Sequence, residues 1–143
     1  MVTLEFEDRF RILLARFSGI HVSEDIPELD WTITKTIAWE GPVHGVLLDY
    51  TLVEAVAVPE TFIVRWGRLP RLSLDYEWVM VAPNPELHRL ARTYAALHCE
   101  LGIKQPRVTV SLSEAYDLLH LEQPNFRPIG HQIASAPKQR KSP

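Results

Sequence analysis

The sequence is poor in the residues that build the commonest chemical sites. Its single cysteine, Cys99, cannot form a disulfide within the chain, and a metal site would need most of its ligands from the six histidines. No glycine-rich stretch has the spacing of a phosphate-binding loop. No apolar run approaches the ~20 residues of a membrane span, and the charged start MVTLEFEDRF is unlike a signal peptide. We therefore expect a cytoplasmic protein without a membrane span, a metal ion or another cofactor.

Length and charge predict one domain followed by a tail of opposite charge. The 143 residues are 46% hydrophobic, enough for a single core. Residues 1–123 hold 18 acidic and 11 basic residues, a net charge of −7, whereas residues 124–143 hold four basic residues and no acid. An acidic body argues against nucleic-acid binding, which needs clustered positive charge. We expect an α/β domain at 1–123 and a mostly disordered tail at 124–143, whose KQRK is either solvated or a contact for an anionic partner.

The hydrophobic pattern predicts an opening hairpin and then helices alternating with strands. Strands are expected at residues 2–7, 10–19, 43–51, 75–83 and 107–113, and helices after Ser23, Pro59, Asn84 and Ser113. The segment WTITKTIAW also alternates like a strand, but the cap at Ser23 and the stop at Gly41-Pro42 favour a helix. The order β-β-α-β-α-β-α-β-α predicts a single-domain, two-layer α/β sandwich with a mixed, largely parallel sheet.

This order, together with the segment GPVHGVLLDYTLVEAV, resembles the STAS domain of sulphate transporters and anti-sigma-factor antagonists. A small-residue turn, a buried strand ending in Asp49 and the hydroxyl of Thr51 are similar to the family's VVLDLS strand. The resemblance covers roughly residues 2–122. It implies a STAS-like fold and a non-enzymatic binding role.

The sequence departs from the family at the turn that carries its phosphorylation switch. Family members of that type have Asp-Ser-Ser/Thr-Gly at the start of the next helix, where a phosphate meets the positive end of the helix dipole. The matching residues 57–60 are AVPE, and the nearest hydroxyl belongs to Thr61, beside the like charge of Glu60. The departure argues against regulation by phosphorylation at this turn.

We expect a partner protein to bind the segment from Asp49 to Arg71. The candidate interaction residues are Asp49, Thr51, Pro59, Glu60, Thr61, Arg65, Trp66 and Arg68. The stretch RWGRLPRL places three arginines around a tryptophan, a combination able to bind carboxylates, phosphates or an acidic peptide. The alternative is a solvated helix end whose arginines pair with the protein's own acidic body.

Three functions compete. The leading hypothesis is a regulatory or protein-interaction module with an unknown protein partner, and self-association into a homodimer is an open alternative. The second is a protein that binds a small apolar ligand or lipid in an enclosed cavity. The third is an enzyme that uses Asp49 with His44 or His120, against which stands a strand-end acid that accepts hydrogen bonds from the following turn. His98, beside the apolar stripe of the long helix, is expected to be partly buried and hydrogen-bonded.

Overall fold

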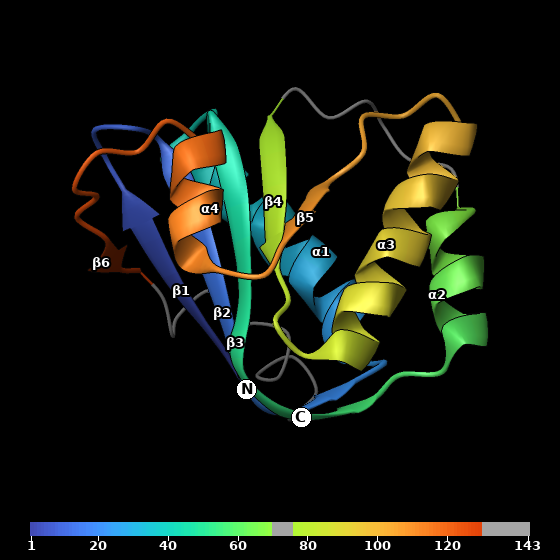
Figure 1. Ribbon diagram of the computed structural model, residues 1–143. Coiled ribbons are helices and arrows are strands. Elements are labelled where there is room, and N and C mark those ends of the chain that lie inside the picture. Colours follow the sequence, from blue (N-terminus) through green and yellow to red (C-terminus); the bar gives the residue numbers. More distant parts are fainter. Residues whose placement is uncertain (70–75, 130–143) are drawn as a thin grey trace, which may run out of the picture.

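A mixed sheet of six strands runs through the part of the chain that the computed structural model describes, residues 1–69 and 76–129 (Figure 1). The strands are β1 (Val2–Glu7), β2 (Ile12–Val22), β3 (Gly45–Ala57), β4 (Glu77–Val81), β5 (Arg107–Thr109) and β6 (Arg127–Pro128). The helices are α1 (Asp25–Glu40), α2 (Glu60–Gly67), α3 (Pro85–Glu100) and α4 (Leu112–Leu118). The α/β class and the predicted order of the first nine elements are confirmed.

The strands lie in the order β5-β4-β3-β2-β1-β6. β1 is antiparallel to both β2 and β6, whereas β2, β3, β4 and β5 run parallel to one another. The opening hairpin and the largely parallel remainder are therefore as predicted. Because each crossover joins neighbouring strands in the same direction, right-handed connections place α1, α2 and α3 on one face of the sheet.

Alternating side chains of the central strands supply two apolar cores. On one face Leu13, Leu48 and Met80 pack with residues of α1, α2 and α3. On the other face Leu14 and Leu47 belong to a smaller core with residues of α4. Buried strands with apolar residues on both faces explain the continuous run VLL in β3. Helix α4 covers only part of its face, in front of β1, β2 and β3 in Figure 1.

The segment with the ambiguous pattern is a helix, α1. Leu29 and Ile33 are buried on its inner side, whereas Trp39 is 80% exposed and does not share a face with Ile33. Ser23 is not the N-cap, contrary to prediction. Glu24 occupies the cap position without a side-chain cap bond, and the carboxylate of Asp25 instead accepts the N–H of Val22 at 3.0 Å.

Both predicted ends of α3 are confirmed. The side chain of Asn84 accepts hydrogen bonds from the amides of Glu86 and Leu87, and Pro85 begins the helix. At the other end Gly102 has a φ of +70°, and the amides after the last turn bond back to the carbonyls of Cys99 and His98. This is the glycine-dependent pattern that satisfies the last carbonyls of a helix.

β3 is longer than predicted. The sequence pattern ends the strand near residue 51, but β3 pairs with β2 as far as Ala57, opposite Val22. The pairing shifts register between Arg16 and Ser18 and again between Gly19 and Ile20. Each shift inserts an extra residue and changes which face the following side chains point to, so the strand loses the alternation by which it would be recognised.

The prediction that a disordered tail begins at residue 124 places its start too early. The carboxylate of Glu7 accepts the amide of Asn125, and the two-residue β6 pairs with β1. Arg127 forms an ion pair with Asp8 at 2.7 Å, and Ile129 is buried. Residues 130–143, with KQRK, lie outside the described part of the chain, as do residues 70–75, with Arg71 and the predicted start of β4.

No helix within residues 1–69 or 76–129 is both long and apolar enough to cross a membrane.

Replacing Gly67 by alanine is expected to lower the free energy of unfolding by about 1–2 kcal/mol. A Cβ at this position would lie 2.8 Å from Cδ1 of Leu97, where α2 packs on α3. The higher helix propensity of alanine offsets the overpacking only in part. Urea unfolding measures the change, with the exposed Arg65→Ala on the same helix as control, for which about 0.5 kcal/mol or less is expected. An unchanged free energy of unfolding for Gly67→Ala would contradict the prediction and show that the Leu97 side chain can move aside without cost.

Candidate functional site

Three charged residues meet on the sheet face that α4 partly covers, and we call them the sheet-face cluster: Glu5, Arg16 and Asp49. Nε of Arg16 lies 3.0 Å from Oδ2 of Asp49, and its Nη1 lies 2.9 Å from Oε2 of Glu5. Asp49 stands directly opposite Arg16 in the β2–β3 register. The Asp49 side chain is 1% exposed and the Arg16 side chain 32%. Asp49, which had no identifiable partner in the sequence, thus has a cation beside it.

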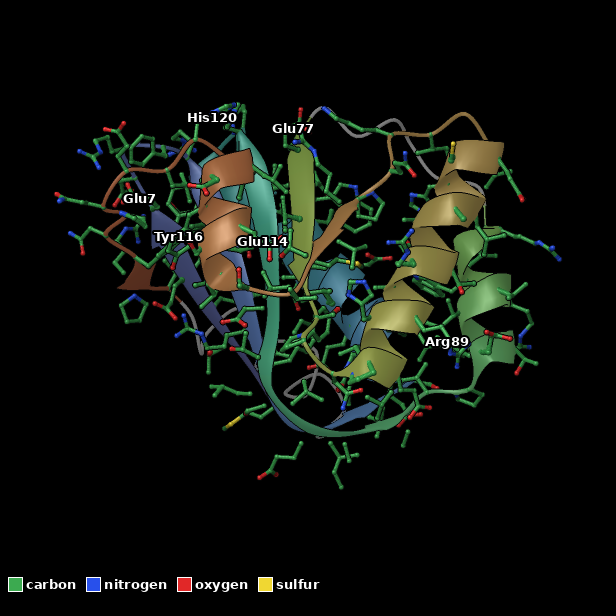
Figure 2. The ribbon with its side chains drawn as sticks, viewed as in Figure 1. Glu7, Glu77, Arg89, Glu114, Tyr116 and His120 are labelled. Carbon is green, nitrogen blue, oxygen red and sulfur yellow. The ribbon has the colours of Figure 1, made fainter. Side chains whose placement is uncertain are left out.

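The surroundings of the cluster are polar on one side and aromatic on the other. The amide of Thr51 donates to Oδ1 of Asp49 at 2.8 Å, which is the bond expected of a strand-end acid. Tyr116 lies where α4 crosses the strands (Figure 2). Burial raises the pKa of Tyr116; Arg16 opposes this, and the carboxylates of Asp49 and Glu5 add to it.

This geometry gives Asp49 a structural role. Its carboxylate joins β3 to β2 through Arg16, which also reaches β1 through Glu5. His44 precedes β3 and lies about 16 Å away along the strand. His120 follows Leu119, whose side chain approaches Gly45 at the start of β3, and Figure 2 labels it at the end of the sheet where β4 begins with Glu77. The structure therefore brings neither histidine to Asp49, and among the described residues no three His, Cys, Asp or Glu side chains could together hold a metal ion.

The second candidate site is the outer side of α2, which we call the α2 surface: Pro59, Glu60, Thr61, Arg65 and Arg68. All five residues are exposed. Thr61, Arg65 and Arg68 follow one another at the spacing of a single helical stripe. Glu60 forms an ion pair with Arg89 of α3. Figure 2 labels Arg89 on the side of α3 that faces α2.

The arginines of the α2 surface form no ion pair with the acids of the described part of the chain. Neither Arg65 nor Arg68 forms an ion pair with any residue in the ranges 1–69 and 76–129. The alternative of a helix end that pairs with the acidic body is therefore not what these parts of the chain show. Two guanidinium groups on one exposed stripe are available for a carboxylate or phosphate of another molecule.

The remaining predicted interaction residues lie apart from the α2 surface. Trp66 is half-buried and stacks on Phe62 with ring centroids 6.1 Å apart, so it belongs to the inner side of the helix. Asp49 lies on the opposite face of the sheet, because its neighbours Leu48 and Tyr50 face α1, α2 and α3. Thr51 is exposed on β3, between the two sites. The expected single surface is thus divided.

The structure contains a buried cluster of three rings that the sequence did not predict. Phe17 stacks on Tyr50 with centroids 4.5 Å apart, and His21 meets both rings edge-on. Nδ1 of His21 lies 3.2 Å from Oδ2 of Asp25, in the first turn of α1. Burial lowers the pKa of His21 and the nearby Asp25 carboxylate opposes this, while burial raises the pKa of Tyr50. The His-Asp spacing of four residues was the one available signal.

His98 is more deeply buried than predicted. It is 0% exposed, and its ring lies 4.4 Å from that of Tyr94 and 5.7 Å from that of Trp78. It therefore belongs to the packing of α3 on β4 and not to a surface site.

Replacing Asp49 by alanine is expected to lower the free energy of unfolding by about 1–3 kcal/mol, because Arg16 and the Thr51 amide each lose a buried acceptor. A double-mutant cycle with Arg16→Met, read by urea unfolding, should show coupling between positions 16 and 49. Additive effects of the two substitutions would contradict a structural ion pair.

The stability of the protein is expected to fall as the pH drops below about 6.5, partly through His21. The pKa of buried His21 is lowered from 6.5, so the unfolded chain binds a proton that the folded protein does not. His21→Phe keeps a ring in the cluster and removes this contribution. Subtracting the urea-unfolding free energies of the two proteins between about pH 7 and pH 5 isolates it; a pH-independent difference would contradict the prediction.

Comparison with known proteins adds no relative. No protein-family model matches the chain, and no curated protein matches it. The interpretation of both sites therefore depends on their own geometry.

Proposed function

We propose that the protein is a non-enzymatic interaction module of the STAS-like kind, which binds an acidic partner protein through the α2 surface. The proposal is supported by the element order and by the resemblance of GPVHGVLLDYTLVEAV to the corresponding STAS strand. Fold similarity alone is weak support for a function, so the argument depends on the α2 surface itself.

The observation that carries the proposal is that Arg65 and Arg68 are exposed and form no ion pair with any residue in the ranges 1–69 and 76–129. Arginine is enriched in protein interfaces because its planar group binds carboxylates through two hydrogen bonds. Here both side chains are exposed on a helix whose inner side is fixed by Ile63 and Gly67. A rigid helix presents the two cations without a loop having to become ordered on binding, which lowers the entropic cost of association.

The binding residues are expected to work without a phosphorylation switch. Thr61 is exposed in the first turn of α2, but its neighbour Glu60 already occupies that turn with a carboxylate held by Arg89. A phosphate on Thr61 would add a second negative charge beside it. Constitutive binding governed by charge, and therefore weakened by salt, suits this arrangement better.

The test is comparative capture from lysate of the native host with immobilised wild-type protein, Arg65→Glu/Arg68→Glu, and the control Lys35→Glu. Lys35 is exposed on α1, remote in sequence from the α2 surface. A specific partner should be retained by the wild type and the control, lost from the double variant, and released by raised salt. Unfolding curves would first show that all three proteins are equally folded.

Equal capture by all three proteins would overturn the α2 surface as the binding site. Native mass spectrometry of the same wild-type preparation separates this result from the other binding hypothesis. A bound small molecule on a monomer would favour the apolar-ligand alternative over a protein-interaction module.

A further inference from the structure

β3 extends beyond the strand on its other side. β4 pairs with β3 only from Gly45 to Asp49, opposite Glu77 to Val81. Over residues 50–57 β3 keeps β2 as its neighbour, and no other described strand pairs with it. We call residues 50–57 the β3 overhang. Figure 1 shows it curving past the end of β4 toward α2.

The edge of the β3 overhang away from β2 carries backbone groups that no other described strand uses. In a parallel ladder alternate residues of a strand direct their N–H and C=O away from the partner strand. Within the described ranges, the Thr51 amide donates to the side chain of Asp49, and no other backbone group of the overhang has a hydrogen bond outside the β2–β3 ladder. Ala55 and Ala57 are exposed, and their methyl groups leave room for a strand to approach the edge. An added strand would satisfy these groups.

The two end strands of the sheet are protected from such pairing, whereas no residue within 1–69 or 76–129 protects the β3 overhang in the same way. β5 is three residues long, and its Arg107 pairs with Glu77, which also holds Lys104. β6 is two residues long and contains Pro128. Short strands, charged side chains and proline are the usual means of blocking edge-to-edge association. The overhang contains one charged residue, Glu54, and no lysine, arginine or proline.

Large apolar side chains stand exposed beside the edge. Leu52 is 55% exposed on the overhang, and Ile20 of the neighbouring strand is 59% exposed. Leu52 lies opposite Ser18 and Ala55 lies opposite Ile20, so Leu52 and Ile20 belong to the same face of the β2–β3 ribbon. It is the same face of the sheet on which Arg16 and Asp49 lie and which α4 partly covers.

We propose that the β3 overhang is a homodimerisation site, where the overhangs of two copies pair as antiparallel strands across a two-fold axis. Backbone groups along an open edge select an extended strand as the occupant. A two-fold contact places each patch against its own image, so the patch must be complementary to itself. The overhang meets this condition because it exposes the apolar Leu52 and carries a single charge, Glu54. A single strand pair with its flanking side chains is a small interface, so the dimer is weak and depends on protein concentration.

Analytical ultracentrifugation of the full chain over a range of concentrations tests the proposal. The wild type should show a monomer–dimer equilibrium, and Leu52→Lys/Ala55→Lys should raise its dissociation constant by about tenfold or more. The matched control is Val110→Lys/Ala96→Lys, which places the same charges on an exposed valine and an exposed alanine away from the overhang. Its dissociation constant should equal that of the wild type.

Cysteine cross-linking locates the contact independently of the charge change. In a Cys99→Ser background, single cysteines placed in turn at residues 52–57 should give a disulfide-linked dimer on mild oxidation, strongest nearest the two-fold axis. Ala96→Cys in the same background should not. A wild type that stays monomeric at every concentration, a dimer insensitive to the lysines, or cross-linking at position 96 alone would overturn the proposal. None of these results bears on the α2 surface, whose test uses different residues.

Discussion

The parallel pairing of β2 with β3 is the constraint on which the rest of the structure depends. It runs from Ile12 opposite Gly45 to Val22 opposite Ala57, and β1 and β4 are each positioned by one member of this pair. Gly45 begins it where a Cβ would lie 3.0 Å from both Ile12 and Leu119 and 3.2 Å from the carbonyl of Glu77. At this point β2, β4 and the end of α4 all approach one backbone position, which a larger residue would push apart.

Much of the fold followed from local signals. The opening hairpin, the alternation of strands with helices and both ends of α3 were readable because each has a local cause, such as the side-chain cap of Asn84 or the positive φ of Gly102. The predictions were wrong where contacts between distant segments determine the structure. β3 continues to Ala57 because β2 supports it there, and β6 forms because Glu7 and Asp8 bind residues that follow them by more than a hundred positions.

The candidate sites also contain features that local sequence signals predict and features that depend on distant residues. The exposed stripe of Arg65 and Arg68 was predictable from helical spacing within α2. The partner of Asp49 was not predictable from the sequence. Arg16 lies 33 residues earlier, and no local pattern indicates that its side chain points toward Asp49. Trp66 was placed with the arginines because it is their neighbour in the chain, yet its ring points inward to Phe62. Sequence proximity predicts a shared surface only when the helical phase agrees.

Net charge is a poor guide to where this protein is positive. The acidic body holds many of its carboxylates in internal pairs: Asp49 and Glu5 with Arg16, Asp8 and Glu40 with Arg127, and Glu77 with Lys104 and Arg107. Arginines and lysines near these acids are paired, whereas Arg65 and Arg68 lie on the outer side of α2 without an ion pair to any described residue. The β3 overhang leads directly into α2 through the buried Val58. A strand paired to the overhang would therefore lie close to Pro59 and Glu60 at the start of α2, whereas Arg68 caps the other end of the helix, about 12 Å away along its axis. Dimerisation through the overhang would therefore leave the two arginines accessible to a partner.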